Sequence, residues 1–383
     1  MNNHSNTISK KRTIAWVTPD YFVDCDFNPD ILSGILKEFD IHWFILLPLF
    51  NARFKEDDFN GLKNIHGLNI EFIYSRHRQR DPRRLLFYFN IYRKTIRLKP
   101  VVIYLNCVPD PYFVPVLWLF NKNKTILCAH DGGVNGGFDF KLITTIAFGL
   151  SYRFFKYVCM FSKSQAEVFH SNFPGVNIFI INLALKSYGE STMPRPADEI
   201  TFLSFGVINY SKNIESLINA ACNIYEQGYH DFKISINGFC TNWDFYEAQI
   251  RYPQIFNCDI RIIGNSEIPN LFNTAHYFVQ PYRHMSQSGA VKVAFNYNVP
   301  VIASNLPGFT DEIEDGVNGY LFDSDNDVKN LEDIMVKVIT RHNSDYCKLL
   351  NQMAVYTDEN YSSKTLSEKY LKMFNQIVDG PND

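Results

Sequence analysis

Short runs of β-branched and aromatic residues alternate with helix-length segments along the whole chain. In the first half the expected strands are residues 13–17, 41–47, 70–74, 101–105, 125–129, 157–161 and 178–181. In the second half they are residues 200–205, 232–236, 260–263, 277–280, 299–303 and 320–322, with helices near 214–227, 268–274 and 328–339. Apolar strands separated by helices are typical of parallel sheets that are covered on both faces. The pattern therefore predicts an α/β fold.

A polar stretch rich in glycine and proline interrupts this rhythm at residues 187–198. The chain of 383 residues is also too long for one typical core. We expect an N-terminal doubly wound, Rossmann-like domain over 1–188, a second such domain over 189–360, and a C-terminal helix over 361–383 that packs back toward the first domain. Such sheets bind ligands at the carboxyl ends of their strands, so the two domains would face a shared central cleft.

Composition narrows the class of protein. Hydrophobic residues make up 46% of the chain and charged residues 20%, as in ordinary globular proteins, and no run of about 18 apolar residues occurs. The polar start lacks the apolar core of a secretory signal, which favours a cytoplasmic protein. The eight cysteines are scattered without a CxxC pair, so we interpret them as reduced residues and not as zinc ligands or disulfides.

One segment is strongly basic although the net charge is −3. Between Arg76 and Lys99, nine basic residues and one acid, Asp81, surround the apolar run at 85–92. Cations beside aromatic and aliphatic side chains suit an anionic membrane surface. The alternative is a solvated basic helix whose apolar side is core. Nucleic acid is not an expected partner, because the rest of the chain is acidic on balance and carries no motif that reads bases.

The segment from Gln280 to Ser304 predicts a strand, a turn of small residues, a short buried helix and a second strand. Backbone N–H groups after Ser288 and Gly289 would point at an anion that the helix dipole also favours. Arg283, just upstream, would add a positive charge. The alternative is an ordinary joint between a strand and a helix.

A similar joint opens the second domain. A strand ends at Gly206, where a ligand could approach the backbone, and Lys212 stands at the entrance of the next helix. Lysine before a helix is common and by itself a weak signal. However, Lys212 and the turn at 288–289 both follow parallel strands, so they would open on the same edge of one sheet.

Taken in order, these segments resemble the C-terminal domain of retaining GT-B glycosyltransferases of family 4, in particular bacterial polysaccharide and O-antigen enzymes. The resemblance rests on Phe205 to Asn213, Pro281-Tyr282-Arg283, Gln287-Ser288-Gly289 and Val299 to Ala303. It implies a nucleotide-diphosphate sugar as donor, with no cofactor or divalent metal required. The donor-binding residues that it implies are Gly206, Asn209, Lys212, Tyr282, Arg283, Gln287, Ser288, Gly289 and Lys292.

The chain departs from the family pattern at several of these positions. Members often bear two glutamates around the turn and helix, and here those positions hold Met285 and Val293. The usual arginine before the lysine is Asn209, and Lys292 is an unusual charge in an otherwise apolar helix. We expect Lys292 either to compensate for the missing glutamate or to extend to the surface as a snorkelling lysine.

In the first domain, His130 and Asp131 follow the strand at 125–129 and precede two glycines. By the resemblance, His130 would face the transferred sugar, and Asp131 would orient it or act as a general base. A single histidine is often structural. The acidic runs at 24–26 and 323–327 we interpret as solvated loops and not as metal sites.

The sequence thus predicts a peripheral glycosyltransferase on the cytoplasmic face of a membrane, with His130, Asp131 and Lys212 as catalytic residues. It would move a sugar from a nucleotide-diphosphate donor to a saccharide or lipid-linked saccharide in surface polysaccharide synthesis. Two alternatives stay open: a GT-B nucleotide-sugar epimerase, and a non-catalytic donor-binding component of a polysaccharide assembly complex.

Overall fold

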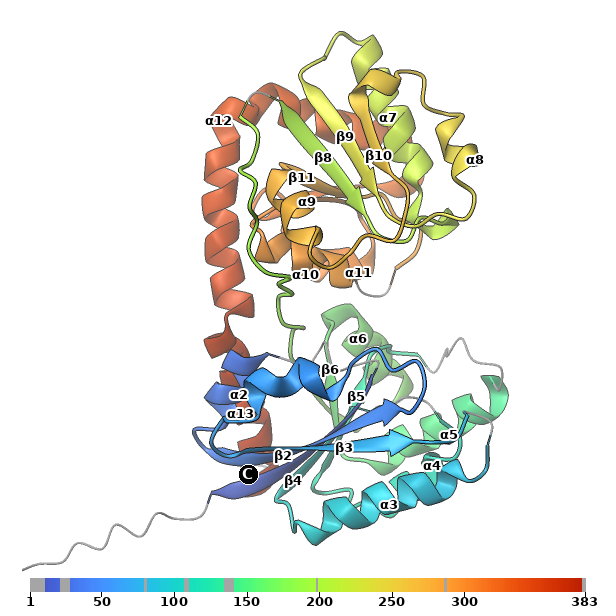
Figure 1. Ribbon diagram of the computed structural model, residues 1–383, viewed down its shortest axis with the longest axis vertical. Coiled ribbons are helices and arrows are strands. Elements are labelled where there is room, and N and C mark those ends of the chain that lie inside the picture. The colour runs from blue at the N-terminus through green and yellow to red at the C-terminus, as the bar shows by residue number, and fades with distance from the viewer. Residues whose placement is uncertain are drawn as a thin grey trace, which may run out of the picture. The chain divides into compact units, whose positions relative to one another are not determined.

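The computed structural model describes residues 11–20, 28–78, 81–106, 110–133, 141–197, 199–285 and 288–380, without the side chains of 141–145 and 147. The chain divides into two compact units (Figure 1). The first runs to Ala184 and also takes in the chain from Ser362 onward, and the second is Leu185–Tyr361. Each unit has a sheet and a hydrophobic core of its own.

The first unit contains a seven-stranded sheet in the order β3-β2-β1-β4-β5-β6-β7. Every pairing is parallel. The strands are β1 (Arg12–Pro19), β2 (Phe39–Pro48), β3 (Leu68–Ser75), β4 (Val102–Asn106), β5 (Thr125–Ala129), β6 (Tyr157–Met160) and β7 (Asn177–Ile180). Strands β2 and β3 are added on one side of β1, and strands β4 to β7 on its other side. The direction in which strands are added to the sheet therefore switches between β3 and β4. In such doubly wound sheets this switch is where ligands bind.

Helices cover both faces of this sheet. One face packs on α2 (Pro29–Ile35), the 3₁₀ segment η2 (Glu56–Leu62) and α13 (Ser363–Asp379), the last of which lies against α2. The other packs on α3 (Arg84–Arg97), α4 (Val114–Leu117), α5 (Lys141–Phe154) and α6 (Lys163–Asn172). Figure 1 shows α3, α4 and α5 side by side, and α4 contacts both of its neighbours.

The second unit has a six-stranded parallel sheet in the order β10-β9-β8-β11-β12-β13. Its strands are β8 (Ile200–Phe205), β9 (Phe232–Asn237), β10 (Phe256–Asp259), β11 (Tyr277–Gln280), β12 (Val301–Ser304) and β13 (Gly319–Phe322). Its helices are α7 (Ile214–Glu226), α8 (Trp243–Glu247), α9 (Ile268–Thr274), α10 (Gly289–Asn296), α11 (Pro307–Thr310) and α12 (Asp327–Tyr361). Short 3₁₀ turns are η3 (Tyr210–Lys212), η4 (Pro253–Ile255) and η5 (Ser324–Asn326).

The predicted α/β class with two parallel sheets is confirmed. The strand expected at 260–263 is wrong, because β10 ends at Asp259 and Ile262 is 78% exposed. The helix expected at 328–339 continues to Tyr361, since apolar residues recur on its buried face through Met353. No helix in the described part of the chain is long and apolar enough to span a membrane.

Candidate functional site

The site in the second unit begins where β8 ends. Gly206 has a φ of +124°, which favours glycine, and a Cβ at this position would meet open space. The neighbouring strand β9 ends close by, because a Cβ on Gly238 would lie 1.8 Å from the carbonyl oxygen of Gly206. These two glycines let the loops after β8 and β9 touch, and they leave the backbone at Gly206 open to a ligand.

The turn η3 carries Lys212 to the edge of the sheet. The Asn209 side chain caps this turn, because its Oδ1 accepts hydrogen bonds from the Ser211 backbone N–H at 3.0 Å and from Ser211 Oγ at 2.6 Å. Asn213 follows in the left-handed conformation, with φ +52°, and starts α7. Asn209 therefore holds the loop in shape, whereas the predicted contact between its side chain and the donor stays a prediction.

The Lys212 ammonium lies on the face of the Tyr282 ring, with Nζ 3.7 Å from the ring centroid. Partial burial lowers the pKa of Lys212. No described carboxylate forms an ion pair with it. Burial raises the pKa of the Tyr282 hydroxyl, and the side chains of Ser288 and Gln280 lie near enough to oppose this rise. Tyr282 thus lies beside both Lys212 and Ser288, so the two joints meet at one edge of the sheet.

The helix α10 begins at this point. Ser288 is its extended N-cap residue and makes no capping hydrogen bond with its own side chain. A Cβ on Gly289 would meet open space, so the first turn is unobstructed there. The N–H groups of a first helical turn have no partner within the helix, and they attract anions together with the helix dipole. The predicted contact of Gln287 lies outside the described residues.

Arg283 is occupied by protein groups. Its Nη2 donates to Glu215 Oε1 at 2.8 Å, and its Nη1 donates to the Tyr210 carbonyl at 2.7 Å. Its backbone N–H also donates to the Ser211 carbonyl. Sequence reasoning missed Glu215, whose only signal was an acidic side chain in the first turn of α7. Arg283 thus braces the turn that carries Lys212, and of these two cations Lys212 is the one without a described carboxylate partner.

The structure contradicts the expectation that Lys292 snorkels to the surface. Its side chain is 3% exposed, and Nζ lies 2.8 Å from Glu312 Oε2 and 3.2 Å from the Tyr361 hydroxyl. Burial raises the pKa of Glu312, whereas the carboxylate raises the pKa of Lys292 against the effect of burial. The buried ammonium is already bound to Glu312 and Tyr361. A direct contact between Lys292 and a donor would therefore require this ion pair to break.

The positions at which related enzymes carry glutamates belong to the core here. Val293 is buried, and Met285 packs against the same hydrophobic cluster. Neither position offers a carboxylate to a ribose.

In the first unit, His130 follows β5. Its Nε2 lies 3.1 Å from Oδ1 of the buried Asn106 at the end of β4, and its ring packs on Phe161 at 4.8 Å between centroids. Burial lowers the pKa of His130 to about 4, so the imidazole is neutral at physiological pH. Asp131 is exposed. The strand ends therefore place a neutral imidazole and an exposed carboxylate next to each other in the chain.

Gly132 fixes the position of this pair against α6. Its N–H donates to Gln165 Oε1 at 2.8 Å, and its carbonyl accepts from Asn172 Nδ2 at 3.2 Å. A Cβ here would lie 2.2 Å from the Gln165 carbonyl oxygen. The close contact explains why glycine follows Asp131. Among the described residues, no group of three or more His, Cys, Asp or Glu side chains is placed to hold a metal ion, and the acidic run at 24–26 lies outside them.

Comparisons with known proteins agree with this architecture. Residues 199–341 match the family described as glycosyl transferases group 1. A search of curated proteins gave no match. Similar solved structures include a glycosyltransferase from Rickettsia africae (TM-score 0.72, 12% identity, 97% of this chain and 100% of that chain). Another is Anabaena HepE in complex with UDP and glucose (TM-score 0.64, 13% identity, 95% of this chain and 100% of that chain). A third is WaaG, a glycosyltransferase involved in lipopolysaccharide biosynthesis (TM-score 0.61, 12% identity, 94% of this chain and 99% of that chain).

The predicted GT-B fold is confirmed by these structures. Residues 199–341 match a glycosyltransferase group 1 domain, and this match together with the shared GT-B fold supports a transferase.

Proposed function

We propose that the protein is a retaining glycosyltransferase of family 4 that transfers a sugar from a nucleotide-diphosphate donor to a saccharide or lipid-linked saccharide acceptor. The observation that carries this proposal is the Lys212 ammonium on the Tyr282 ring, at the sheet edge where α10 begins with Ser288. A half-buried cation beside the N–H groups of a helix start is suited to a diphosphate. Anabaena HepE, of similar fold, holds UDP and glucose, which supports a nucleotide-sugar donor.

In this mechanism, the bond between the anomeric carbon and the diphosphate breaks, and the diphosphate takes the bonding electrons. Lys212 and the first N–H groups of α10 stabilise the negative charge that develops on the leaving group, and such electrostatic stabilisation usually contributes most to the rate enhancement of an enzyme. His130, as a neutral imidazole, holds a sugar hydroxyl. Asp131 accepts the proton of the attacking acceptor hydroxyl. No resident cofactor takes part in these steps, and the fold of WaaG supports a place in surface polysaccharide synthesis, including that of lipopolysaccharide.

Release of nucleoside diphosphate from a panel of nucleotide sugars, with and without saccharide acceptors, tests the proposal. We expect release with at least one donor, and a loss of about 100-fold in kcat for Lys212→Ala, as when one charge-stabilising group is removed. The control is Lys348→Ala, which changes an exposed lysine of α12. Inversion of a sugar centre in the donor without acceptor would identify an epimerase. Donor binding without turnover would identify a non-catalytic binding component.

The peripheral membrane location is part of the proposal. The sequences of α3, α4 and α5 contain no acidic residue. Large apolar side chains are exposed on α3, on α5 and in the turn after α4: Leu85, Leu86, Phe89, Trp118, Leu119, Ile146, Leu150 and Phe154. Within the basic segment from Arg76 to Lys99, the described side chains of Arg76, Arg78, Arg93, Arg97 and Lys99 form no ion pair with other described residues. Each cation near an anionic bilayer contributes about 1 kcal/mol to binding.

Co-sedimentation with vesicles tests the membrane surface. We expect binding to vesicles that contain phosphatidylglycerol, and less binding for Leu86→Ser/Phe89→Ser. The matched control is Val168→Ser/Ile180→Ser, which removes exposed apolar residues of α6 and β7. Equal binding to neutral and anionic vesicles, or equal effects of the two double variants, would contradict a docking surface on α3.

A further inference from the structure

The first unit contains a cavity of about 450 Å³ at the carboxyl ends of its central strands. It is lined by Val17 and Pro19 of β1, by the end of β2 and the loop after it, by residues 75–78 after β3, and by Asn106 of β4. The first turns of α3 close it through Arg84, Phe87 and Tyr88. The cavity therefore lies at the topological switch of the sheet, where β1 separates the two directions of winding.

The lining of the cavity combines apolar and cationic side chains. Its apolar wall consists of residues from Leu46 to Phe50 together with Phe87 and Phe113, and Phe50 is 75% exposed. The lining also contains three arginines, Arg76, Arg78 and Arg84. Among the described lining residues the one carboxylate is Asp20. Its oxygens accept the backbone N–H groups of Arg53 and Phe54 at 2.8 and 3.1 Å, so Asp20 is engaged in holding a loop.

Arg84 forms part of the wall and is not available to a ligand. Its Nε donates to Asp110 Oδ2 at 2.6 Å, and its Nη2 donates to the Tyr88 hydroxyl at 2.6 Å. Tyr88 in turn donates to the same Asp110 oxygen, and burial raises the pKa of Tyr88. The guanidinium, the phenol and the carboxylate thus satisfy one another inside the wall.

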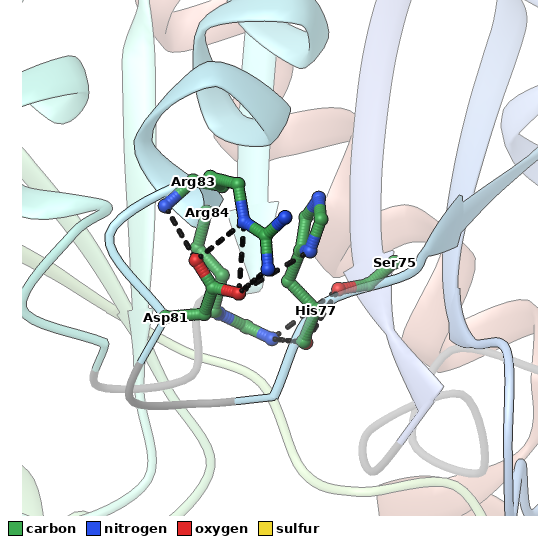
Figure 2. A network of polar contacts seen from close by, with 5 residues as sticks. All are labelled: Ser75, His77, Asp81, Arg83 and Arg84. Carbon is green, nitrogen blue, oxygen red and sulfur yellow. Dashed lines mark hydrogen bonds and ion pairs between the residues drawn. The ribbon is translucent and has the colours of Figure 1, made fainter.

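A polar network holds the segment that carries the other two arginines (Figure 2). Arg84 Nη1 donates to the His77 carbonyl at 3.2 Å and to Ser75 Oγ at 3.3 Å. Asp81 binds the Arg83 guanidinium and lies 3.4 Å from His77 Nδ1. The Arg83 guanidinium keeps the pKa of Asp81 near 2, so this carboxylate is charged at physiological pH. The network therefore fixes Ser75, His77 and Asp81, which lie close to Arg76 and Arg78 in the chain.

Arg76 and Arg78 are the two arginines of the cavity lining that are not bound to a described carboxylate. Both are exposed and line the cavity, and neither forms an ion pair with another described residue. They precede α3 in the chain, and the Asp81 carboxylate at the start of this helix is already bound by Arg83. Two guanidinium groups in a cavity with an apolar wall suit an anion attached to a hydrocarbon. Arginine binds phosphate oxygens in a bidentate manner, which makes a phosphate ester the preferred anion.

We propose that this cavity binds the acceptor through a phosphate ester carried on an apolar chain, with Arg76 and Arg78 on the phosphate and the apolar wall on the first part of the chain. This inference rests on the proposed transferase function. Asn106 lines the cavity and contacts His130, so a sugar beyond the phosphate would reach the imidazole that we place at the reacting sugar. Large apolar side chains are also exposed on α3, the helix whose first turns line the cavity, which suits a chain rooted in a bilayer.

Binding of farnesyl diphosphate, inorganic pyrophosphate and farnesol to the full chain, measured by calorimetry, tests the proposal. We expect farnesyl diphosphate to bind at least tenfold more tightly than either other probe. Arg76→Gln/Arg78→Gln should weaken its binding at least tenfold and leave folding intact, since neither side chain has a described partner. Arg93→Gln/Arg97→Gln, with the same change of charge on α3 outside the cavity, should change it less than twofold.

Three results would overturn the proposal. They are equal binding of farnesol and farnesyl diphosphate, equal binding of pyrophosphate and farnesyl diphosphate, and equal effects of the two double variants. The Lys212→Ala variant should bind farnesyl diphosphate as the unmodified protein does, because its change lies in the other unit. If nucleotide sugar is cleaved but farnesyl diphosphate is not bound, the transferase stands and this site fails. If farnesyl diphosphate is bound but no donor is used, the site stands and the transferase fails.

Discussion

Replacement of Lys292 by methionine should strongly destabilise the second unit. The change keeps the length of the side chain but leaves the Glu312 carboxylate, which is 7% exposed, without the ammonium that now lies 2.8 Å away. Removing one partner of a buried ion pair costs about 3–5 kcal/mol in the free energy of unfolding. For a unit of this size, each kcal/mol lowers Tm by about 2–4 °C, so Tm should fall by about 6–20 °C.

The pH dependence of the variant follows from Glu312. Without Lys292, burial keeps the pKa of Glu312 in the folded unit above its value in the unfolded chain. The folded variant therefore loses stability as the pH rises from the unfolded pKa through the folded pKa, and the deficit should be larger at about pH 8 than at about pH 5.5. Lys292→Met/Glu312→Gln removes both charges and should recover most of the loss.

Urea and thermal unfolding followed by circular dichroism, together with titrations of a bound nucleotide sugar, would measure these effects. The control is Lys348→Met, which makes the same change at an exposed position of α12. We expect the folded double variant to bind donor as the unmodified protein does. The reasoning is refuted if Lys292→Met is no more destabilising than Lys348→Met, and most clearly if it weakens donor binding instead.

Three further predictions concern other parts of the two sites. Gly132→Ala should lower the free energy of unfolding by about 1–3 kcal/mol, because the new Cβ would meet backbone atoms of α6; thermal unfolding beside Gly61→Ala, where nothing lies within 4 Å, checks it. The imidazole of His130 should titrate near pH 4 in an NMR experiment because burial disfavours its charged form, and a midpoint near 6.5 would contradict the packing described here. Arg283→Gln should weaken donor binding about tenfold, less than Lys212→Ala, since it acts through the Tyr210 turn; Arg251→Gln, at an exposed ion pair with Glu226, should leave donor binding unchanged.

Local sequence patterns predicted much of the fold. Short runs of β-branched and aromatic residues between helices predicted both parallel sheets, because burial on both faces leaves a continuous apolar signature. The joint location of Lys212 and Ser288 was also predictable. They follow β8 and β11, and parallel strands that pair in a sheet bring the loops after them to one edge. The tyrosine between them, Tyr282, belongs to the sequence motif, but its role as the contact surface for Lys212 depends on side-chain packing.

The sequence could not predict which charged residues pair when they lie far apart in the chain. Glu215 precedes Arg283 by 68 residues, and nothing local indicates that the two charges meet. Lys292 belongs to a helix in which Val291, Val293, Ala294 and Phe295 are also buried, so no polar face marks where the lysine points. Its partner Glu312 comes from another part of the unit. The β10 boundary was missed because Ile260 to Ile263 has the composition of a strand, yet Arg261 pairs there with Asp259 and Glu267 in a loop.

The most direct test of the central claim is whether Lys212 holds a nucleotide-diphosphate sugar. Thermal unfolding should be measured with a panel of nucleotide sugars for the unmodified protein, Lys212→Ala and Lys348→Ala. A donor present at about 100 times its Kd stabilises the fold by about 2.7 kcal/mol, which raises Tm by several degrees. We predict such a rise with at least one nucleotide sugar, its loss in Lys212→Ala and its retention in Lys348→Ala. A rise of the same size in all three proteins, or no rise with any nucleotide sugar, would contradict the account.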